Sequence, residues 1–475
     1  MTMNDQELIT QLQKILGKEH VITQASDLQT YLVDWRKRYQ GQAIAAVRPA
    51  NTEEVSEVVK LCATNKIAMV PQGGNTGMCG GATPNSSGRQ IVISMQRMNK
   101  VREVDIANQT ITVEAGCILQ ALQEAAAAQD RYFPLSLGAE GSCMIGGNLS
   151  TNAGGTSVLR YGNTRELCLG LEVVLPNGEI LNSLRGLRKD NTGYDLRDLF
   201  IGAEGSLGII TAAVMKIFPV PVAQWTALVA TPSAKAAVEL LNCFQAGASA
   251  QLTGFEMMSD ESLALLKHYY PDLASPLKGP NPYEVLVELS DYESQEHAKQ
   301  LMEKILETAL ENGCATDAVI ASNLTQAKKF WDMREHVPLA QADDGPNIKH
   351  DVSLPISGIP TFIETCSTLL RKKYPNIRII NYGHLGDGNL HFNVAGPSSA
   401  ETEAFFTTQS KHIQTLVYAE VEKLNGSISA EHGVGQQKVD YLASHRGEVA
   451  LHVMRSIKQA IDPHNLMNPG KVIAI

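Results

Sequence analysis

Two short, glycine-flanked segments hold the side chains best suited to bind a metal ion. One runs from Gly383 to Asn393 (GHLGDGNLHFN) and the other from Ser429 to Gly435 (SAEHGVG). Glycine on both sides permits turns and a close approach of a ligand. Two imidazoles with a carboxylate suit zinc with an open coordination position, and non-haem iron uses the same set. The segments contain three of the 12 histidines and one glutamate, namely His384, His391, Glu431 and His432.

The spacing of these residues requires a turn. His391 and Asn393 are two residues apart, so their side chains share one face of a strand. His384 would point to the other face if the strand were continuous, but the Gly386-Asp387-Gly388 sequence allows a turn between the two histidines. We therefore expect three metal ligands with a base beside them, in the order His384, His391, Glu431 and His432.

The composition indicates a globular protein with more than one domain. The chain has 475 residues, 44% of them hydrophobic and 19% charged, and a single core rarely grows to that length. A net charge of −10 argues against nucleic acid as a partner, because such binding needs a basic face. The polar start, MTMNDQE, lacks the features of a signal peptide, and no transmembrane segment is expected. The eight cysteines are scattered without a CxxC pair, which favours reduced thiols and a cytoplasmic location.

The hydrophobic patterns predict helices in residues 1–40 and a βαβ unit over 43–71. Residues 90–220 are rich in strands and glycine, and Asn177-Gly178 is a two-residue hairpin signal. Between 222 and 380, helices and strands alternate, as in an α+β cap with an antiparallel sheet. Helices are expected at 233–246, 258–269, 292–312, 324–336 and 358–373, and strands near 284–289 and 377–380.

Three glycine-rich stretches predict a binding site for a long ligand that carries phosphates. Residues 72–81 contain five glycines, and consecutive backbone amides in such a loop hold phosphate oxygens. The loop is not a P-loop, because no Gly-Lys-Ser/Thr follows it. Residues 141–155 and 202–208 are similarly rich in glycine. Three such loops in one domain favour an extended ligand such as a dinucleotide, held mainly by the backbone.

Nearly the whole chain resembles one group of flavoproteins. Residues 43–220 resemble the FAD-binding domain of the vanillyl-alcohol-oxidase/PCMH superfamily, and residues 222–475 resemble the FAD-linked oxidase C-terminal domain. The motifs occur in the expected order. They are QGGNTG (72–77), IGGN (145–148), TNAGG (151–155), YG (161–162) and IGAEGSLG (201–208), followed by the two histidine segments and MNPGK (467–471).

The resemblance implies an α+β protein with a PCMH-type FAD-binding domain, a substrate or cap domain with an antiparallel sheet, and a short C-terminal helical segment. The implied limits are an N-terminal helical segment at 1–42, the FAD domain at 43–220, the cap domain with the metal site at 221–430, and a segment completing both sites at 431–475. FAD would be bound non-covalently, because no histidine lies between His20 and His268. The residues implied to bind FAD are Gln72, Gly73, Gly74, Asn75, Thr76, Gly77, Ser142, Gly146, Gly147, Thr151, Asn152, Gly155, Glu204, Gly205, Ile210 and Asn468.

Within the superfamily, the chain resembles the D-2-hydroxyacid dehydrogenases, first those acting on D-2-hydroxyglutarate and next those acting on D-lactate. The implied reaction oxidises the hydroxy acid to the 2-oxo acid, with hydride passing from C2 to flavin N5. The substrate would chelate a divalent metal, commonly zinc in this family. The metal would lower the pKa of the substrate hydroxyl, as it lowers that of bound water from about 15.7 to roughly 7. His432 would then accept the proton as general base.

The resemblance assigns the substrate to Arg334, Lys349, Asn393 and His432. A guanidinium fork suits a carboxylate. One position departs from the family pattern. Four residues after the arginine, 2-hydroxyglutarate enzymes tend to carry a hydroxyl residue, and this chain has Pro338, which has neither a hydroxyl nor an N–H. D-lactate or another D-2-hydroxy acid therefore stays open as the substrate.

Two other functions fit parts of the sequence. A metal-independent FAD oxidase of a sugar or lactone would use the same FAD fold, but would leave the metal ligands without a role. A zinc hydrolase would use these ligands, but would bind no flavin. For the dehydrogenase, an external electron acceptor is expected, an electron-transfer flavoprotein or a quinone, because the chain has no second redox motif. The family also often forms homodimers.

Overall fold

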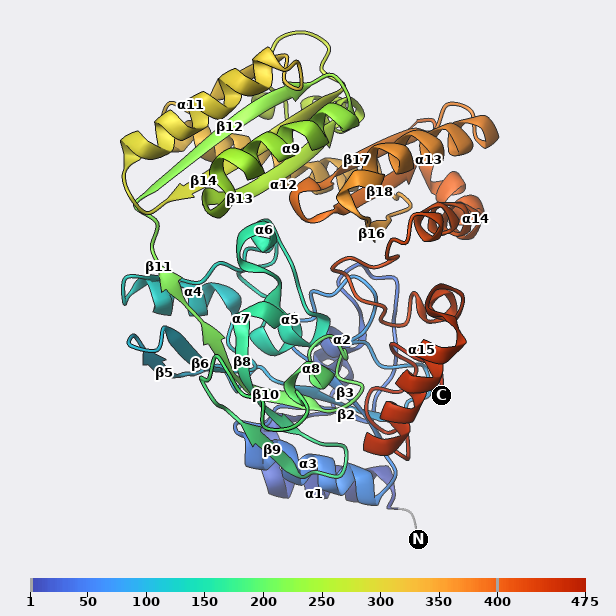
Figure 1. Cartoon of the computed structure of the whole chain (residues 1–475). Helices are drawn as coiled ribbons and strands as arrows, with labels where there is room; N and C mark the ends of the chain where they lie inside the picture. The colour runs from blue at the N-terminus through green and yellow to red at the C-terminus, as the bar shows by residue number, and fades with distance from the viewer. Residues whose placement is uncertain (1–2, 399–400) are drawn as a thin grey trace. The chain divides into compact units, whose positions relative to one another are not determined.

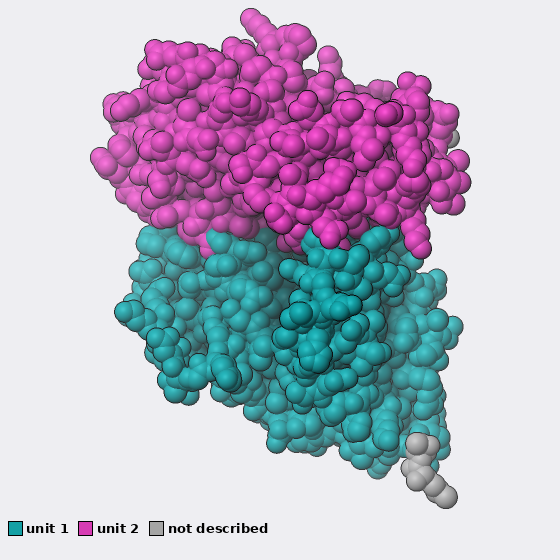
Figure 2. Space-filling view, turned by 45° about the vertical axis from the view of Figure 1, so that its right-hand side comes forward, with its two compact units in different colours: residues 1–154, 162–220, 431–475 teal, residues 155–161, 221–430 magenta. Residues whose placement is uncertain are grey.

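The computed structural model describes residues 3–398 and 401–475, which fold into two compact units (Figure 2). Unit 1 holds the residues up to 154 together with 162–220 and 431–475, and unit 2 holds 155–161 and 221–430. The short piece 155–161, placed in the flavin domain by the limits given above, folds with unit 2. It forms helix α6 (Val158–Tyr161) against strand β13 (Leu252–Ser259), and Tyr161 Oη lies 3.0 Å from Tyr292 Oη.

The first sheet of unit 1 contains the expected βαβ unit. Strands β2 and β3 both pair in parallel with β4, in the order β1-β2-β4-β3. Helix α3 begins where the Asn51 side chain accepts a hydrogen bond of 2.8 Å from the Glu54 amide, as an N-cap residue does. Strand β3 lies at the sheet edge and leads into the first glycine loop. The elements here are α1 (Asp5–Leu16), β1 (Val21–Ile22), α2 (Ala25–Leu32), β2 (Ala45–Val47), α3 (Thr52–Thr64), β3 (Ala68–Gln72) and β4 (Gln90–Ser94).

The second sheet of unit 1 is antiparallel, in the order β5-β6-β10-β8-β9. The hairpin predicted at Asn177-Gly178 is confirmed. Gly178 has a φ of +85°, and the Leu175 amide donates to the Glu179 carbonyl at 2.9 Å between β8 and β9. The strands are β5 (Val101–Asp105), β6 (Thr110–Glu114), β8 (Cys168–Val174), β9 (Ile180–Ser183) and β10 (Ile209–Lys216).

Helices and a small strand pair complete unit 1. The expected C-terminal helical segment is α15 (Val439–Ile461), which is kinked at Gly447, where φ is +74°. In the part of the chain that the structure describes, no helix combines the length and apolar character needed to cross a bilayer. The other elements are α4 (Leu119–Ala127), α5 (Ile145–Thr151), α7 (Thr164–Leu167), α8 (Arg197–Phe200), β7 (Arg131–Tyr132) and β11 (Phe218–Pro219).

Unit 2 is built on a seven-stranded antiparallel sheet, as expected for the cap, in the order β15-β12-β14-β13-β17-β18-β16. The turn predicted between His384 and His391 is confirmed, because β17 and β18 form a hairpin in which Gly388 has a φ of +86°. The strands besides β13 are β12 (Ala223–Thr231), β14 (Tyr283–Asp291), β15 (Asp317–Ile320), β16 (Asp351–Ser353), β17 (Arg378–His384) and β18 (Asn389–Ala395).

Helices cover both faces of this sheet (Figure 1). Helices α9 and α11 pack together on one face, with α13 against α9. Helices α10 and α12 pack on the opposite face, where Phe330, Met333 and Val337 of α12 are buried against the sheet. The expected helices are all present. They are α9 (Ala234–Ala248), α10 (Asp260–Tyr269), α11 (Gln295–Glu311), α12 (Leu324–Asp344) and α13 (Ile359–Lys373), joined by α14 (Thr402–Lys423).

Helix α12 is longer than its sequence predicts. It was expected to end at 336, but it continues through Pro338 to Asp344. Because proline has no N–H, the carbonyl of Arg334 receives no helical hydrogen bond from position 338. The buried side chains of Val337 and Ala340 on either side of the proline stabilise the helix through tertiary packing, which sequence patterns do not report.

Candidate flavin and metal sites

A cavity in unit 1 is lined by residues of all three glycine-rich stretches and by His432. Most residues predicted to bind FAD lie on its wall, namely Gln72, Gly73, Gly74, Asn75, Thr76, Gly77, Gly146, Gly147, Thr151, Glu204, Gly205 and Ile210. Ser142, Asn152 and Asn468 are not lining residues, and Gly155 belongs to unit 2. The wall also includes Asn148, which belongs to the IGGN motif (145–148) but is not among the residues predicted to bind FAD.

The glycines of this cavity serve two different purposes. A Cβ atom on Gly74 would lie 2.0 Å from the Ser142 carbonyl oxygen, so glycine is needed there for the first and second stretches to meet. By contrast, a Cβ atom on Gly77 or Gly147 would have no other atom within 4 Å. These two glycines leave open space in the cavity, where a ligand can approach the backbone closely.

The side chains of Gln72 and Asn75 anchor the first loop to its own unit. Gln72 Nε2 donates to the carbonyl oxygens of Tyr31 at 3.0 Å and Ala82 at 2.9 Å. The bond to Ala82 joins the two ends of the loop. Asn75 has a φ of +55°, and its Nδ2 donates to the Val33 carbonyl at 2.8 Å. The loop is therefore held in shape by its own side chains, and its backbone is left to face the cavity.

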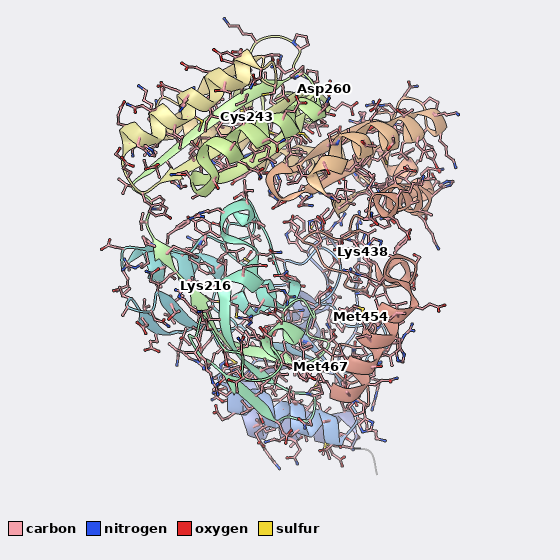
Figure 3. The ribbon with its side chains drawn as sticks, viewed as in Figure 1. Lys216, Cys243, Asp260, Lys438, Met454 and Met467 are labelled. Carbon is pink, nitrogen blue, oxygen red and sulfur yellow. The ribbon has the colours of Figure 1, made fainter. Side chains whose placement is uncertain are left out.

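Glu204 and Asn468 connect the C-terminal segment to the glycine stretches. The Glu204 carboxylate accepts hydrogen bonds from the amides of Val434 at 2.6 Å and Gly435 at 2.8 Å. Burial raises the pKa of Glu204, and the two amides oppose that shift. Asn468 Nδ2 donates to the carbonyls of Gly81 and Glu204. Figure 3 shows Lys438 and Met467 in this segment.

The cavity suits a ligand with phosphates and polar edges. The Oδ1 atom of Asn148 is buried on its wall and has no hydrogen-bond partner within the described residues. Such an atom is costly unless something binds it. Together with the open glycines and their backbone amides, it fits FAD, the cofactor that the resemblance implies.

In unit 2, polar residues line up across four neighbouring strands. Glu256 of β13 lies directly opposite His384 of β17, and Tyr382 of β17 lies opposite His391 of β18. Asp351 of β16 lies opposite His391 on its other side. Because directly opposed residues in an antiparallel sheet point to the same face, the strand register brings these residues to the face that α12 covers.

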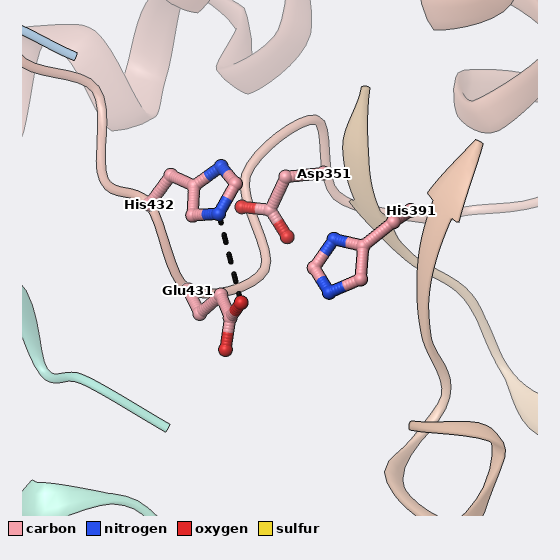
Figure 4. Close-up of side chains that lie close together, drawn as sticks. All are labelled: Asp351, His391, Glu431 and His432. Atoms are coloured by element: carbon pink, nitrogen blue, oxygen red, sulfur yellow. Dashed lines mark ion pairs between the residues drawn. The ribbon is translucent and has the colours of Figure 1, made fainter. Parts of the chain in front are cut away.

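Two of these side chains, Asp351 and His391, also belong to a group of four that can hold a metal ion. The other two members are Glu431 and His432, and all four are drawn in Figure 4. One ligand atom from each lies within 4.8 Å of the others. Glu431 follows Ala430, whose amide donates to the Asp351 carbonyl at 3.3 Å, and His432 Nε2 lies 3.6 Å from Glu431 Oε1. Sequence reasoning named three of the four. Asp351 was missed because only the pairing of β16 with β18 places it opposite His391.

His384, the remaining predicted ligand, is adjacent to this group rather than within it. Its ring centroid is 5.6 Å from that of His391. Its Nδ1 lies 2.6 Å from Glu256 Oε1. The other carboxylate oxygen, Oε2, accepts a hydrogen bond of 2.7 Å from Arg334 Nε. Burial alone would raise the pKa of Glu256, but the charges of His384 and Arg334 outweigh it and lower that pKa.

The other predicted substrate residues lie nearby in unit 2. Arg334 is buried on α12, with its guanidinium 4.8 Å from the centre of the Tyr382 ring. Asn393 is buried on β18, where its Oδ1 accepts from the His350 amide at 3.0 Å and its Nδ2 donates to Gln341 Oε1 at 3.1 Å. Lys349 is half-buried just before β16. Pro338 stands one helical turn after Arg334.

Comparison with known proteins decides the family. The profile of a family described as "FAD linked oxidases, C-terminal domain" matches residues 220–472, more than half of the chain. The chain belongs to the FAD-linked oxidases. A second profile, "FAD binding domain", matches residues 43–183. The chain is thus an FAD-dependent oxidoreductase, so FAD as a cofactor and the expected enzyme class are confirmed.

Relatives of this FAD-linked oxidase are similar along nearly its whole length. A protein of Xanthomonas citri named D-2-hydroxyglutarate dehydrogenase is 37% identical over 99% of this chain and 97% of its own. One of Stutzerimonas stutzeri with the same name is 34% identical over 99% and 100%. A Bos taurus protein named D-2-hydroxyglutarate dehydrogenase, mitochondrial, is 38% identical over 95% and 81%.

Solved structures share the fold at low sequence identity. A substrate-bound p-cresol methylhydroxylase superposes with a TM-score of 0.78 at 17% identity, covering 98% of this chain and 96% of the other. An alkyldihydroxyacetonephosphate synthase reaches a TM-score of 0.73 at 19% identity, covering 98% and 84%. The expected α+β architecture with a PCMH-type FAD domain is confirmed.

Proposed function

We propose that this FAD-linked oxidase is a metal-dependent dehydrogenase that oxidises a D-2-hydroxy acid to the 2-oxo acid, with D-2-hydroxyglutarate as the first candidate substrate. One observation carries the proposal. His432 lines the flavin cavity and also belongs to the metal-binding group with Asp351, His391 and Glu431. A proton acceptor common to both sets suits a reaction that removes a proton from a hydroxyl group and a hydride from the carbon that carries it. The relatives named above support the substrate class.

The donor atoms around the proposed metal are imidazole nitrogens and carboxylate oxygens. Such a set suits zinc and similar divalent ions, and the absence of sulfur ligands among the residues named here is typical of catalytic rather than structural zinc. We propose His384, His391 and Glu431 as ligands, as the resemblance implies, with Asp351 as a further carboxylate beside them. When bound, a divalent ion lowers the pKa of a coordinated hydroxyl.

The protein's own groups then have distinct tasks. FAD, held non-covalently by the glycine stretches, supplies the hydride acceptor. His432, whose Nε2 lies 3.6 Å from Glu431 Oε1, receives the hydroxyl proton. Arg334 binds a substrate carboxylate through the terminal nitrogens that Glu256 does not engage. Lys349 adds a second cation. Asn393 contributes the Nδ2 hydrogen that is not used in its hydrogen bond to Gln341.

Pro338 bears on the tail of the substrate. Pro338 replaces the hydroxyl expected of glutarate enzymes, and the relatives at 34–38% identity nevertheless carry the glutarate name. D-2-hydroxyglutarate is therefore proposed first and D-lactate second. We further propose that an external carrier, an electron-transfer flavoprotein or a quinone, reoxidises the flavin, and that the protein forms a homodimer.

An anaerobic titration of the purified FAD-loaded protein tests the proposal. D-2-hydroxyglutarate should bleach the flavin spectrum, and its L isomer should not. The extent of bleaching by D-lactate, which lacks the glutarate tail, measures how much that tail contributes. A chelator should abolish bleaching, and added zinc should restore it. Bleaching by sugars or lactones that is insensitive to chelator would favour the metal-independent oxidase, and an FAD-loaded protein that no 2-hydroxy acid reduces would refute the proposal.

A further inference from the structure

We infer that Glu256 is a positioning residue that holds the metal ligand His384 and the substrate-binding Arg334 at once. This inference rests on the proposed function. Glu256 is only 1% exposed. Its Oε1 lies 2.6 Å from His384 Nδ1, and its Oε2 lies 2.7 Å from Arg334 Nε. A single buried carboxylate thus links the two predicted sites.

The fold places Glu256 between its two partners. It is opposite His384 in the register of β13 and β17. Helix α12 packs over the same face of the sheet and places Arg334 against the Glu256 carboxylate. A buried carboxylate is costly unless it is paired and hydrogen-bonded. Glu256 meets that condition only because one partner comes from the neighbouring strand and the other from the helix.

For His384, the contact fixes which ring nitrogen faces a metal. A carboxylate that is paired with a guanidinium accepts hydrogen bonds and donates none, so His384 Nδ1 carries the hydrogen of the contact with Oε1. The lone pair is then on Nε2, and a metal would be bound through that nitrogen. Carboxylates that bind the outer nitrogen of a ligating histidine in this way fix its tautomer and ring orientation, and their removal typically weakens metal binding by about 10–100-fold.

For Arg334, the contact fixes the plane of the guanidinium. Nε is held by Glu256, and the group stacks 4.8 Å from the centre of the Tyr382 ring. Within the described residues, no acceptor binds Nη1 or Nη2 of Arg334, and neither atom is both buried and unsatisfied. These two nitrogens are free to bind a carboxylate in a bidentate manner.

Glu256→Gln separates the two tasks of the carboxylate. An amide has one acceptor atom and one donor atom, so it cannot accept from both His384 and Arg334. Because Arg334 can only donate, the amide oxygen turns toward Arg334. The amide nitrogen then faces Nδ1 and favours the tautomer with hydrogen on Nε2, which cannot bind a metal.

We would measure zinc affinity of the FAD-loaded protein by competition with a chromogenic chelator, together with kcat and KM. Glu256→Gln should weaken zinc binding by about 10–100-fold. Glu288→Gln is the matched control. Glu288 is a half-buried carboxylate on the neighbouring strand β14 that also binds α12, by accepting from Trp331 Nε1 at 2.8 Å, and among the described residues it accepts no hydrogen bond from a histidine. Glu288→Gln should leave zinc affinity unchanged.

A double variant tests the mechanism itself. In Glu256→Gln/Arg334→Met, the amide oxygen is released from Arg334 and can accept from His384, so zinc affinity should return toward the wild-type value. KM for the hydroxy acid should be raised, because Arg334 no longer binds the substrate carboxylate. A general packing defect would not be rescued by a second core substitution. If Glu256→Gln does not yield folded protein, Glu256→Asp replaces it, since the shorter side chain cannot reach both partners.

Wild-type zinc affinity in Glu256→Gln, or an equal loss in Glu288→Gln, would overturn the inference. The proposed function fails separately. If the wild-type protein binds no zinc, or if no 2-hydroxy acid bleaches its flavin, the proposed function is wrong. If the wild-type protein does both and Glu256→Gln behaves identically, only the role of Glu256 is wrong.

Discussion

Gly147→Ala should separate flavin binding from folding. Gly147 is in helix α5 and lines the flavin cavity, and a Cβ atom there would meet nothing within 4 Å. Alanine is a better helix former than glycine by about 0.8–1.0 kcal/mol in a helix interior. The protein without FAD should therefore be as stable as the wild type or slightly more stable.

The added methyl should act on the bound cofactor instead. It occupies space that the glycine leaves for the ligand, and one extra methyl in a filled site typically costs about 1–3 kcal/mol. At about 1.4 kcal/mol per tenfold change in affinity, FAD binding should weaken by about 5-fold to 150-fold.

The assay is reconstitution of the FAD-free protein, followed by quenching of flavin fluorescence, with thermal unfolding measured in parallel. Two further variants bracket the result. Gly138→Ala, where a Cβ atom also meets nothing within 4 Å and which does not line the cavity, should change neither quantity. Gly74→Ala, with its Cβ 2.0 Å from the Ser142 carbonyl oxygen, should lose both stability and FAD. Wild-type FAD affinity in Gly147→Ala would show that the flavin does not occupy this cavity.

Three further predictions address the metal site and the C-terminal segment. His432→Ala should lose about 10²–10⁴-fold in turnover while FAD and zinc stay bound, and steady-state kinetics with cofactor analysis would check this; near-normal turnover would remove it from the mechanism. Asp351→Asn should weaken zinc binding at least tenfold in the chelator competition, and unchanged affinity would exclude Asp351 from the metal's surroundings. Burial lowers the pKa of Lys471 from 10.5 to about 8, against a raising effect of Glu204. Because the unfolded chain then binds more protons between these two values, unfolding free energy should rise as the pH increases from about 8 to 10.5, by up to ~3 kcal/mol. The rise should be missing in Lys471→Met, and equal pH profiles of the two proteins in chemical denaturation would contradict the burial argument.

Local patterns predicted most elements of the fold because local chemistry forms them. Asn51 caps α3 through its own side chain, and Asn177-Gly178 closes a hairpin with the positive φ that glycine readily adopts. Helix α12 is the exception. Pro338 ends the helix by local rules, but packing on the sheet extends it to Asp344. A proline signals a local cost, and the packing energy that offsets it comes from residues distant in sequence.

The sequence by itself determined the flavin stretches, the cofactor class and the short histidine segments, because those motifs place their functional groups within a few residues of one another. Only the tertiary structure decided what surrounds them. Asp351 joins His391 through strand pairing, and Glu256 joins His384 through strand register and Arg334 through helix packing. Glu256 is 78 residues from Arg334 and 128 from His384. No local pattern links residues so far apart, because their proximity depends on how seven strands and a covering helix assemble.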